Sequence, residues 1–173
     1  VIGVPEPKTW NDLADPRWRS WVVLADPSRS SSAGAAFMII VERAMVDALH
    51  EGRTEDEGWA RGMGQIRLIA SNAKMFTESS SEVPSIVGIG DAGAGMAIDF
   101  YGRVYEETVG PGRCRMITPE GATATTPDPV AILEGVRGEP LTLATRFVEF
   151  FLTPEGQRVW ILKAGEPGGQ IGR

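Results

Sequence analysis

The chain has 173 residues, of which 42% are apolar and 23% charged, and its formal net charge is −6. This length suffices for one domain with a hydrophobic core, and the composition is that of an ordinary globular protein. The negative charge, together with the absence of any run rich in Lys and Arg, argues against a nucleic-acid-binding protein. No stretch approaches the roughly 18 consecutive apolar residues of a membrane-spanning helix.

The two ends of the chain, and the two residue types that occur only once, narrow the class of protein further. The sequence opens on VIGVPEPKTW, without an initiator Met or the basic and apolar regions of a signal peptide, and it closes on GEPGGQIGR. We therefore expect the chain to be a fragment of a longer protein. The single cysteine, Cys114, excludes an internal disulfide and a metal site of several cysteines. The single histidine, His50, excludes most catalytic sites that need an imidazole.

The first predicted elements are a short helix, a buried strand and a long helix. Thr9 can cap a helix over residues 10–14, and the apolar run in SWVVLADP predicts a strand over 21–25. From 33 to 50, apolar residues recur every three or four positions, which is the pattern of an amphipathic helix.

A second helix and a second strand follow. Thr54 and Glu57 have the spacing of a capping box, so we expect a helix that begins there and fades near residue 71. The tripeptide KMF is a candidate for a short strand, and residues 81–89 predict one or two helical turns.

The rest of the chain continues the alternation of strands and helices. In the next buried strand we expect Gly93 and Gly95 to allow close packing. The remaining predicted elements are a strand in 93–100, a helix over 101–110, strands over 113–118 and 129–133, and helices over 139–152 and 154–164.

This order of elements indicates an α/β fold, with helices on both faces of a small sheet that is mixed or mostly parallel. We find no internal repeat and no clear linker, and we expect residues 1–173 to form a single lobe. Aromatic residues at helical spacing are predicted to lie in the core. They are Trp59, Phe147, Phe150, Phe151 and Trp160.

Polar residues follow the first predicted strand in the stretch ADPSRSSS. Small polar residues before a helix are often only caps. The same arrangement also forms an anion site, because the free N–H groups and the positive dipole end of the helix point back at the strand. Arg29 adds a positive charge that can pair with phosphate or carboxylate.

The arrangement occurs three times. FTESSSEVP also leads from a strand through hydroxyl-bearing residues into a helix, and GMAIDFYG leads from a strand into another helix. In open α/β sheets, ligands bind outside the carboxyl ends of the strands. If the strands are parallel, we expect the three segments to meet at one ligand site.

An enzyme has less support. There is no G-x-S-x-G elbow, no P-loop, no H-E-x-x-H and no Rossmann glycine run. Glu78 and Asp99 could form an acid–base pair, although carboxylates at strand ends more often bind donors or cap helices. We expect no catalytic residue, no cofactor and no metal site.

Three stretches of the chain resemble bacterial extracellular solute-binding proteins of ABC importers. The resemblance is closest to the branch of this family that includes ferric-iron, sugar-phosphate and phosphonate binders. Its most specific pieces are WNDL near the start and TPEGQ near the end. The stretches are PKTWNDLADPRWRSWVVLADPSRSSSAGAAF, FTESSSEVPSIVGIGDAGAGMAIDF and PVAILEGVRGEPLTLATRFVEFFLTPEGQRVW.

The resemblance implies a two-lobed clamp that is periplasmic or extracellular, in some members lipid-anchored, and that delivers a solute to an ABC permease of the inner membrane. This chain would be most of the second lobe, with the fold of a type II periplasmic binding protein. We expect the isolated lobe to bind its ligand weakly and to form a homodimer through the surface that faces the first lobe. An effector-binding sensor of the same fold is the alternative.

The resemblance also implies which residues bind the solute. The ferric-iron branch tends to have two adjacent tyrosines where this chain has Phe100 and Tyr101, so direct iron binding is the less favoured alternative. The serine-rich segments and Arg29 favour a small anionic organic solute. The predicted ligand residues are Arg29, Ser30, Ser31, Thr77, Glu78, Ser79, Ser80, Asp99, Phe100 and Tyr101.

Overall fold

The computed structural model describes residues 3–110, 112–162 and 165–168. The chain forms two compact units, Val1–Thr125 and Thr126–Arg173, which are described separately here. The sequence predicts one lobe without a linker, and the assignment of both units to one lobe stays a prediction. Within the described ranges, none of the helices is both long and apolar enough to cross a membrane.

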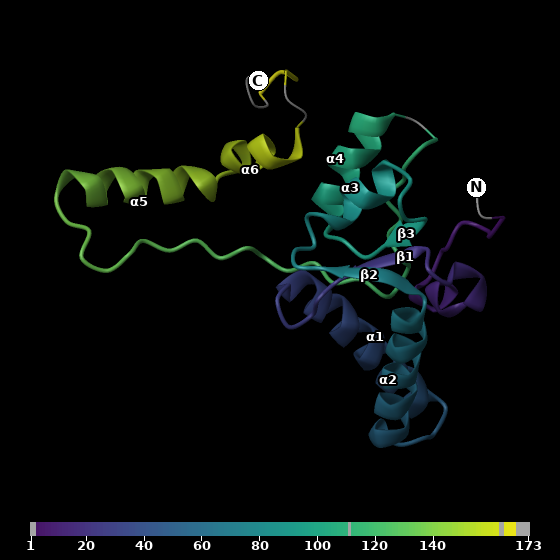
Figure 1. The fold of residues 1–173 in the computed structure, drawn as a ribbon. Helices are drawn as coiled ribbons and strands as arrows, with labels where there is room; N and C mark the ends of the chain where they lie inside the picture. The colour runs from purple at the N-terminus through teal and green to yellow at the C-terminus, as the bar shows by residue number, and fades with distance from the viewer. Residues whose placement is uncertain (1–2, 111, 163–164, 169–173) are drawn as a thin grey trace. The chain divides into compact units, whose positions relative to one another are not determined.

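The first unit contains a three-stranded sheet with helices on both faces, which confirms the predicted α/β fold (Figure 1). The strand order is β2-β1-β3, and both pairings with the central strand are parallel. The elements in chain order are η1 (Trp10–Ala14), η2 (Pro16–Trp18), β1 (Val22–Ala25), α1 (Ser31–His50), α2 (Glu55–Ser71), β2 (Ala73–Thr77), α3 (Val83–Gly88), β3 (Ala94–Gly95) and α4 (Asp99–Val109).

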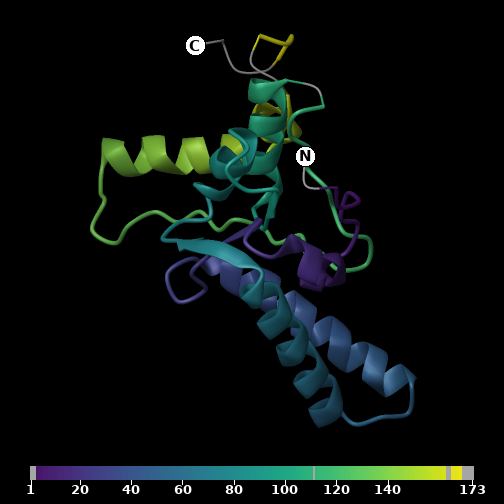
Figure 2. The ribbon, with the colours of Figure 1, turned by 45° about the vertical axis from the view of Figure 1, so that its right-hand side comes forward.

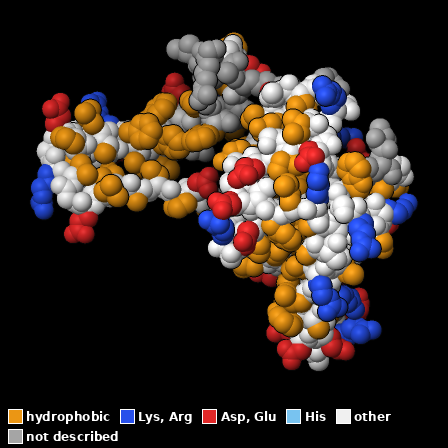
Figure 3. All heavy atoms as spheres, viewed as in Figure 1, with side chains coloured by type: hydrophobic (Ala, Val, Ile, Leu, Met, Phe, Trp, Pro, Cys, Tyr) orange, Lys and Arg blue, Asp and Glu red, His pale blue; other side chains and the backbone are white. Residues whose placement is uncertain are grey.

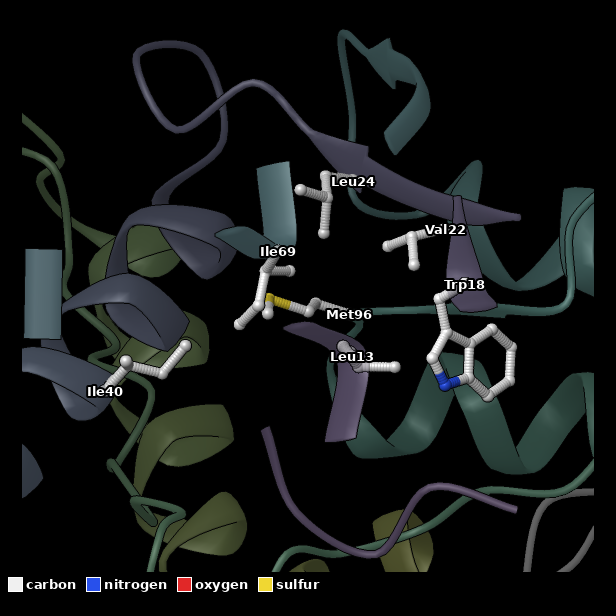
Figure 4. Packing of buried hydrophobic residues seen from close by; sticks show 7 residues of the cluster. All are labelled: Leu13, Trp18, Val22, Leu24, Ile40, Ile69 and Met96. Atoms are coloured by element: carbon white, nitrogen blue, oxygen red, sulfur yellow. The ribbon is translucent and has the colours of Figure 1, made fainter. Parts of the chain in front are cut away.

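The central strand β1 is buried at all four positions, as expected for a parallel strand covered on both faces. Alternate side chains of a strand point to opposite faces, so β1 contributes to two hydrophobic clusters. Val22 and Leu24 pack with Ile40 of α1 and Ile69 of α2, as Figure 4 shows. On the other face, the second cluster contains Val23 and Ala25 together with Ala33, Val83 and Ala92.

Helices α1 and α2 form a closely packed pair, and Figure 2 shows them side by side below the sheet. The contact depends on two glycines of α2. A Cβ atom at Gly58 would lie 2.9 Å from the Ala44 carbonyl oxygen, and one at Gly62 would lie 2.7 Å from the Cα of Val41. Only residues without a side chain allow the two backbones to approach this closely.

The third strand is shorter than predicted, and of the two glycines predicted to allow close packing, Gly95 is confirmed. β3 contains only Ala94 and Gly95. A Cβ atom at Gly95 would lie 2.8 Å from the Val23 carbonyl oxygen and would also contact the side chain of Val83. Gly95 therefore allows α3 to lie directly against β1 and β3.

The second unit contains two helices, α5 (Glu139–Phe151) and α6 (Pro154–Ile161). Thr153 caps α6 as predicted, since its hydroxyl oxygen accepts from the Gly156 N–H at 3.1 Å. The rings of Phe147 and Trp160 both contact Phe151, at centroid distances of 5.4 and 5.6 Å. The predicted helix over 154–164 ends at residue 161, and residues 163–164 lie outside the described ones.

Several predictions about elements and core residues are wrong. Residues 113–118 and 129–133 form no strand, because no neighbouring strand in the described chain offers them an edge for pairing. Four of the five aromatic residues predicted for the core are exposed, namely Trp59, Phe147, Phe150 and Trp160. Figure 3 shows hydrophobic side chains exposed along α5. The helical spacing is present, but no described residue of the same unit buries these four side chains.

Candidate functional site

The candidate site lies at the carboxyl edge of the sheet in the first unit. Because β2, β1 and β3 are parallel, they end at the same edge of the sheet. Their last residues are Thr77, Ala25 and Gly95. The segments that follow are the first loop (residues 26–30), the second loop (residues 78–82) and the third segment (residues 96–101). The strands are parallel, as the expectation from the sequence required, and that the three segments meet at one ligand site stays a prediction.

The first loop is shaped by Asp26, whose role the sequence analysis did not predict. One carboxylate oxygen of Asp26 accepts from the Ser28 N–H at 2.8 Å and from the Ser28 hydroxyl at 2.7 Å. These two hydrogen bonds hold the pKa of the Asp26 carboxyl below its ordinary value, and the one from the Ser28 hydroxyl has the larger effect. The Asp26 carbonyl oxygen also accepts from the N–H groups of Arg29 and Ser30. An Asp two residues before a Ser is the sequence signal for this turn.

Ser30 is buried and is the N-cap of α1, with its hydroxyl oxygen accepting from the Ala33 N–H at 3.4 Å. It therefore performs the ordinary capping role that the sequence left open beside ligand binding. Ser31 is exposed in the first turn of α1, and its hydroxyl makes no hydrogen bond within the described part of the chain.

The hydroxyl groups in and just before the second loop differ in their hydrogen bonding. The buried Thr77 donates its hydroxyl hydrogen to the Ser79 carbonyl oxygen at 2.8 Å, and the hydroxyls of Ser79 and Ser81 are 2.8 Å apart. Ser80 is buried, yet its hydroxyl has no partner among the described residues. Because no fully enclosed polar side-chain atom in the described chain lacks a partner, this hydroxyl reaches the surface.

One contact joins the first loop to the end of β2, and another joins it to the second loop. The Asp26 N–H donates to the Thr77 carbonyl oxygen at 2.8 Å, which extends the pairing of β1 with β2. An ion pair joins Nη1 of Arg29 to Oε1 of Glu78 at 2.6 Å. Both side chains are largely exposed, at 57% and 73%. The structure therefore brings together the two loops that the sequence identified separately.

The third segment differs from its prediction, because α4 begins at Asp99 rather than at Tyr101. Asp99, Phe100 and Tyr101 therefore lie in the first turn of a helix. Asp99 is 3.8 Å from Nε of Arg103, and the rings of Phe100 and Tyr101 are 4.3 Å apart. No hydrogen bond, ion pair or ring contact joins this turn to the first or second loop within the described residues, so its place in the site stays a prediction.

A cavity of about 610 Å³ in the first unit lies elsewhere. It is lined by the segment around Trp10, the glycine-rich β3 region, one side of α4 and residues 112–119. None of the ten predicted ligand residues lines it. The candidate site is instead an open edge with exposed charges, which is the geometry of one wall of a cleft. Among the described residues, no group of three or more His, Cys, Asp or Glu side chains could hold a metal ion.

The two carboxylates considered as an acid–base pair are both engaged by arginines. Glu78 pairs with Arg29 and Asp99 with Arg103. No contact between Glu78 and Asp99 is present in the described chain. The geometry thus offers no support for catalysis by this pair.

Comparisons with solved structures place this fold among periplasmic binding proteins. The chain is similar to the periplasmic binding protein AfuA from Actinobacillus pleuropneumoniae, solved with exogenous fructose-6-phosphate bound, with 24% identity and a TM-score of 0.65 over 92% of this chain and 46% of that one. It is also similar to the periplasmic binding protein P5PA, with 17% identity and a TM-score of 0.62 over 99% of this chain and 50% of the other. The chain thus spans about half the length of both.

A family comparison matches residues 1–167 to the bacterial extracellular solute-binding proteins. The chain belongs to this family, as the sequence resemblance predicts. A comparison with curated proteins finds no significant match.

Proposed function

We propose that this protein is the solute-binding component of an ABC importer and that it binds a small anionic organic solute at the carboxyl edge of the sheet β2-β1-β3. The solute would contact the ten predicted ligand residues and be enclosed when a second lobe closes over this edge. Residues 1–173 would form most of one lobe of this clamp. The match to about half of each similar solved structure supports this assignment.

One observation carries the proposal, namely the parallel pairing of β1 and β2 that sets both serine-rich loops side by side. The Asp26 N–H to Thr77 carbonyl contact continues this pairing into the loops. The edge then presents a guanidinium group, free hydroxyls and the start of the 20-residue helix α1. Backbone N–H groups at a helix start, hydroxyls and an Arg are the donors that phosphate and carboxylate groups require.

Location and partners follow from the proposed role. The family is extracellular, which supports a place in the periplasm or on the outside of the cell, with a lipid anchor as a further proposal. The partners would be the solute and an ABC permease of the inner membrane, and no reaction would be catalysed. A homodimer of the isolated lobe is also proposed.

The test is a thermal-shift screen of the purified protein against sugar phosphates, phosphonates, carboxylates, polyamines and ferric salts. A micromolar ligand at millimolar concentration adds about 4 kcal/mol to the free energy of unfolding, which gives an easily measured shift. We expect a shift with fructose-6-phosphate or another anionic organic compound. In Arg29→Gln the affinity should fall about tenfold or more, because a charged hydrogen bond is lost.

The matched control is Arg19→Gln. Arg19 precedes β1 and therefore lies at the opposite, amino edge of the sheet, where it is exposed. This variant removes the same charge and should bind as the wild type does. Equal losses in both variants would show that only the net charge matters. A shift with ferric salts alone would identify an iron-binding protein instead.

A further inference from the structure

The ion pair between Arg29 and Glu78 places a carboxylate where an anionic solute would bind. Oε1 of Glu78 is 2.6 Å from Nη1 of Arg29, the distance of a charge-assisted hydrogen bond. The two residues are 49 positions apart in the chain and come from different strand ends. The contact therefore depends on the fold of the edge itself.

Glu78 is held only weakly. Within the described residues its carboxylate has no partner other than Arg29, and its side chain is 73% exposed. Asp26, by contrast, is fixed by two hydrogen bonds from Ser28. Exposed ion pairs of this kind change an equilibrium constant by less than about tenfold. Glu78 can therefore leave Arg29 at little cost, whereas Asp26 stays in the turn.

Arg29 keeps most of its donors free. A guanidinium group has five N–H donors in a planar fork, and in the described chain Glu78 engages Arg29 through a single nitrogen. A phosphate group can accept two parallel hydrogen bonds from such a fork, and it carries more charge than a carboxylate. An incoming phosphate therefore has more to gain at Arg29 than Glu78 loses.

We propose that Glu78 is an internal competitor for the anionic group of the solute at Arg29, so that binding exchanges one anion for another. This rests on the proposed anion-binding function and assigns Glu78 a different role from direct contact with the solute. The exchange makes Glu78 a residue that sets the affinity of the site, because only a solute that binds Arg29 more strongly than Glu78 does can displace it. A solute with a single carboxylate only replaces an equivalent group, whereas a phosphate monoester gains charge and a second hydrogen bond.

The experiment measures binding of fructose-6-phosphate and gluconate to the purified protein by isothermal titration calorimetry. The variants are Glu78→Gln, Arg29→Gln and the double variant. Glu82→Gln is the matched control, because Glu82 is an exposed glutamate four positions further on whose side chain makes no hydrogen bond or ion pair in the described chain. It removes the same charge near the edge without affecting the ion pair.

We expect Glu78→Gln to bind fructose-6-phosphate about threefold to tenfold more tightly, since the competing carboxylate is gone. Glu82→Gln should change the affinity less than twofold. In the Arg29→Gln background the additional Glu78→Gln change should have no effect, because the competitor has lost its binding partner. The wild type should prefer fructose-6-phosphate over gluconate, and Glu78→Gln should strengthen the binding of both by the same factor, because the competing carboxylate has to leave Arg29 whichever solute enters.

Two results would overturn the inference while leaving the proposed function intact. Weaker binding in Glu78→Gln would show that Glu78 contacts the solute directly. If Glu82→Gln gained as much affinity as Glu78→Gln, the removal of any negative charge near the edge would explain the effect. In both cases Arg29→Gln would still lose affinity. If neither probe binds the wild type or Glu78→Gln, or if Arg29→Gln binds as tightly as the wild type, the anion site itself is wrong and the inference fails with it.

Discussion

Asn72 is one of the few polar side chains buried in the first unit, with 4% of its surface exposed. It follows α2 directly, and its amide nitrogen donates to the carbonyl oxygens of Leu13 and Asp15 at 2.9 and 2.8 Å. Leu13 belongs to η1, and Asp15 lies between η1 and η2. A single side chain thereby attaches the N-terminal segment to the end of α2.

We expect Asn72→Ala to lower the free energy of unfolding by about 1–3 kcal/mol, because two hydrogen bonds to partly buried carbonyl oxygens are lost and, among the described residues, the Asp15 carbonyl keeps only the Trp18 N–H. Asn11→Ala is the control, since Asn11 is exposed on η1 and its side chain makes no hydrogen bond in the described chain. Urea denaturation followed by circular dichroism measures both. Equal stability of the two variants would show that the buried amide contributes nothing.

Cys114 is half-buried at the wall of the 610 Å³ cavity. Burial raises the pKa of its thiol above the ordinary value, and the nearby Glu106 carboxylate acts in the same direction. A raised pKa lowers the thiolate fraction at a given pH, and the thiolate is the reactive form. We therefore expect iodoacetamide to alkylate Cys114 at pH 8 more slowly in the folded protein than in urea. A folded protein that reacts as fast as the unfolded one would contradict this.

At the scale of elements, the contact between α1 and α2 allows a sharp test within a single helix. Gly62 faces the backbone of α1, where a Cβ atom would lie 2.7 Å from the Cα of Val41. Gly64 lies in the same helix, but no atom is within 4 Å of its Cβ position. The same substitution at the two positions therefore separates packing from helix propensity.

We expect Gly62→Ala to lower the free energy of unfolding by about 1–3 kcal/mol through overpacking against α1. Gly64→Ala should raise it by about 0.5–1 kcal/mol, because alanine loses less conformational freedom than glycine in a helix. Thermal or urea denaturation gives both values. Stabilisation by both substitutions would mean that the helices separate without cost.

The helices could be predicted from the sequence largely because their ends are encoded locally. Thr54 and Glu57 form the predicted capping box, with the Glu57 carboxylate accepting from the Thr54 N–H at 3.0 Å, and Thr153 caps α6. The strands are different, because a strand exists only where another strand pairs with it. The apolar runs in 113–118 and 129–133 have suitable residues, but no partner strand within the described chain.

In the candidate site, too, the locally encoded features could be predicted from the sequence, and those that depend on distant residues could not. Strand ends followed by serine-rich segments are visible in the sequence, and the parallel sheet then places them on one edge. The pairing of Arg29 with Glu78 could not be predicted, because it depends on the register of β1 against β2. The exposure of Trp59 and Phe147 could not be predicted either, because helical spacing identifies an apolar face without showing what covers it.

At the scale of the whole molecule, the buried core is concentrated in the first unit. Every residue of the two hydrophobic clusters belongs to residues 1–125. In the second unit α5 has no buried residue, and the buried residue of α6 is Gly156. Between α4 and α5, the backbone N–H groups of residues 123–135 donate no hydrogen bond in the described chain.

Hydrogen exchange measured by mass spectrometry on the purified protein tests this division. Amides exchange through local openings, and the free energy of opening rises with buried contacts and protected hydrogen bonds. We expect peptides from β1 and α1 to stay protected for hours and those from 123–135 to exchange within seconds. Peptides from α5 and α6 should fall in between and exchange well before the core. Protection of α5 equal to that of α1 would contradict this, and it would show that the apolar face around Phe147 and Phe150 is covered in solution.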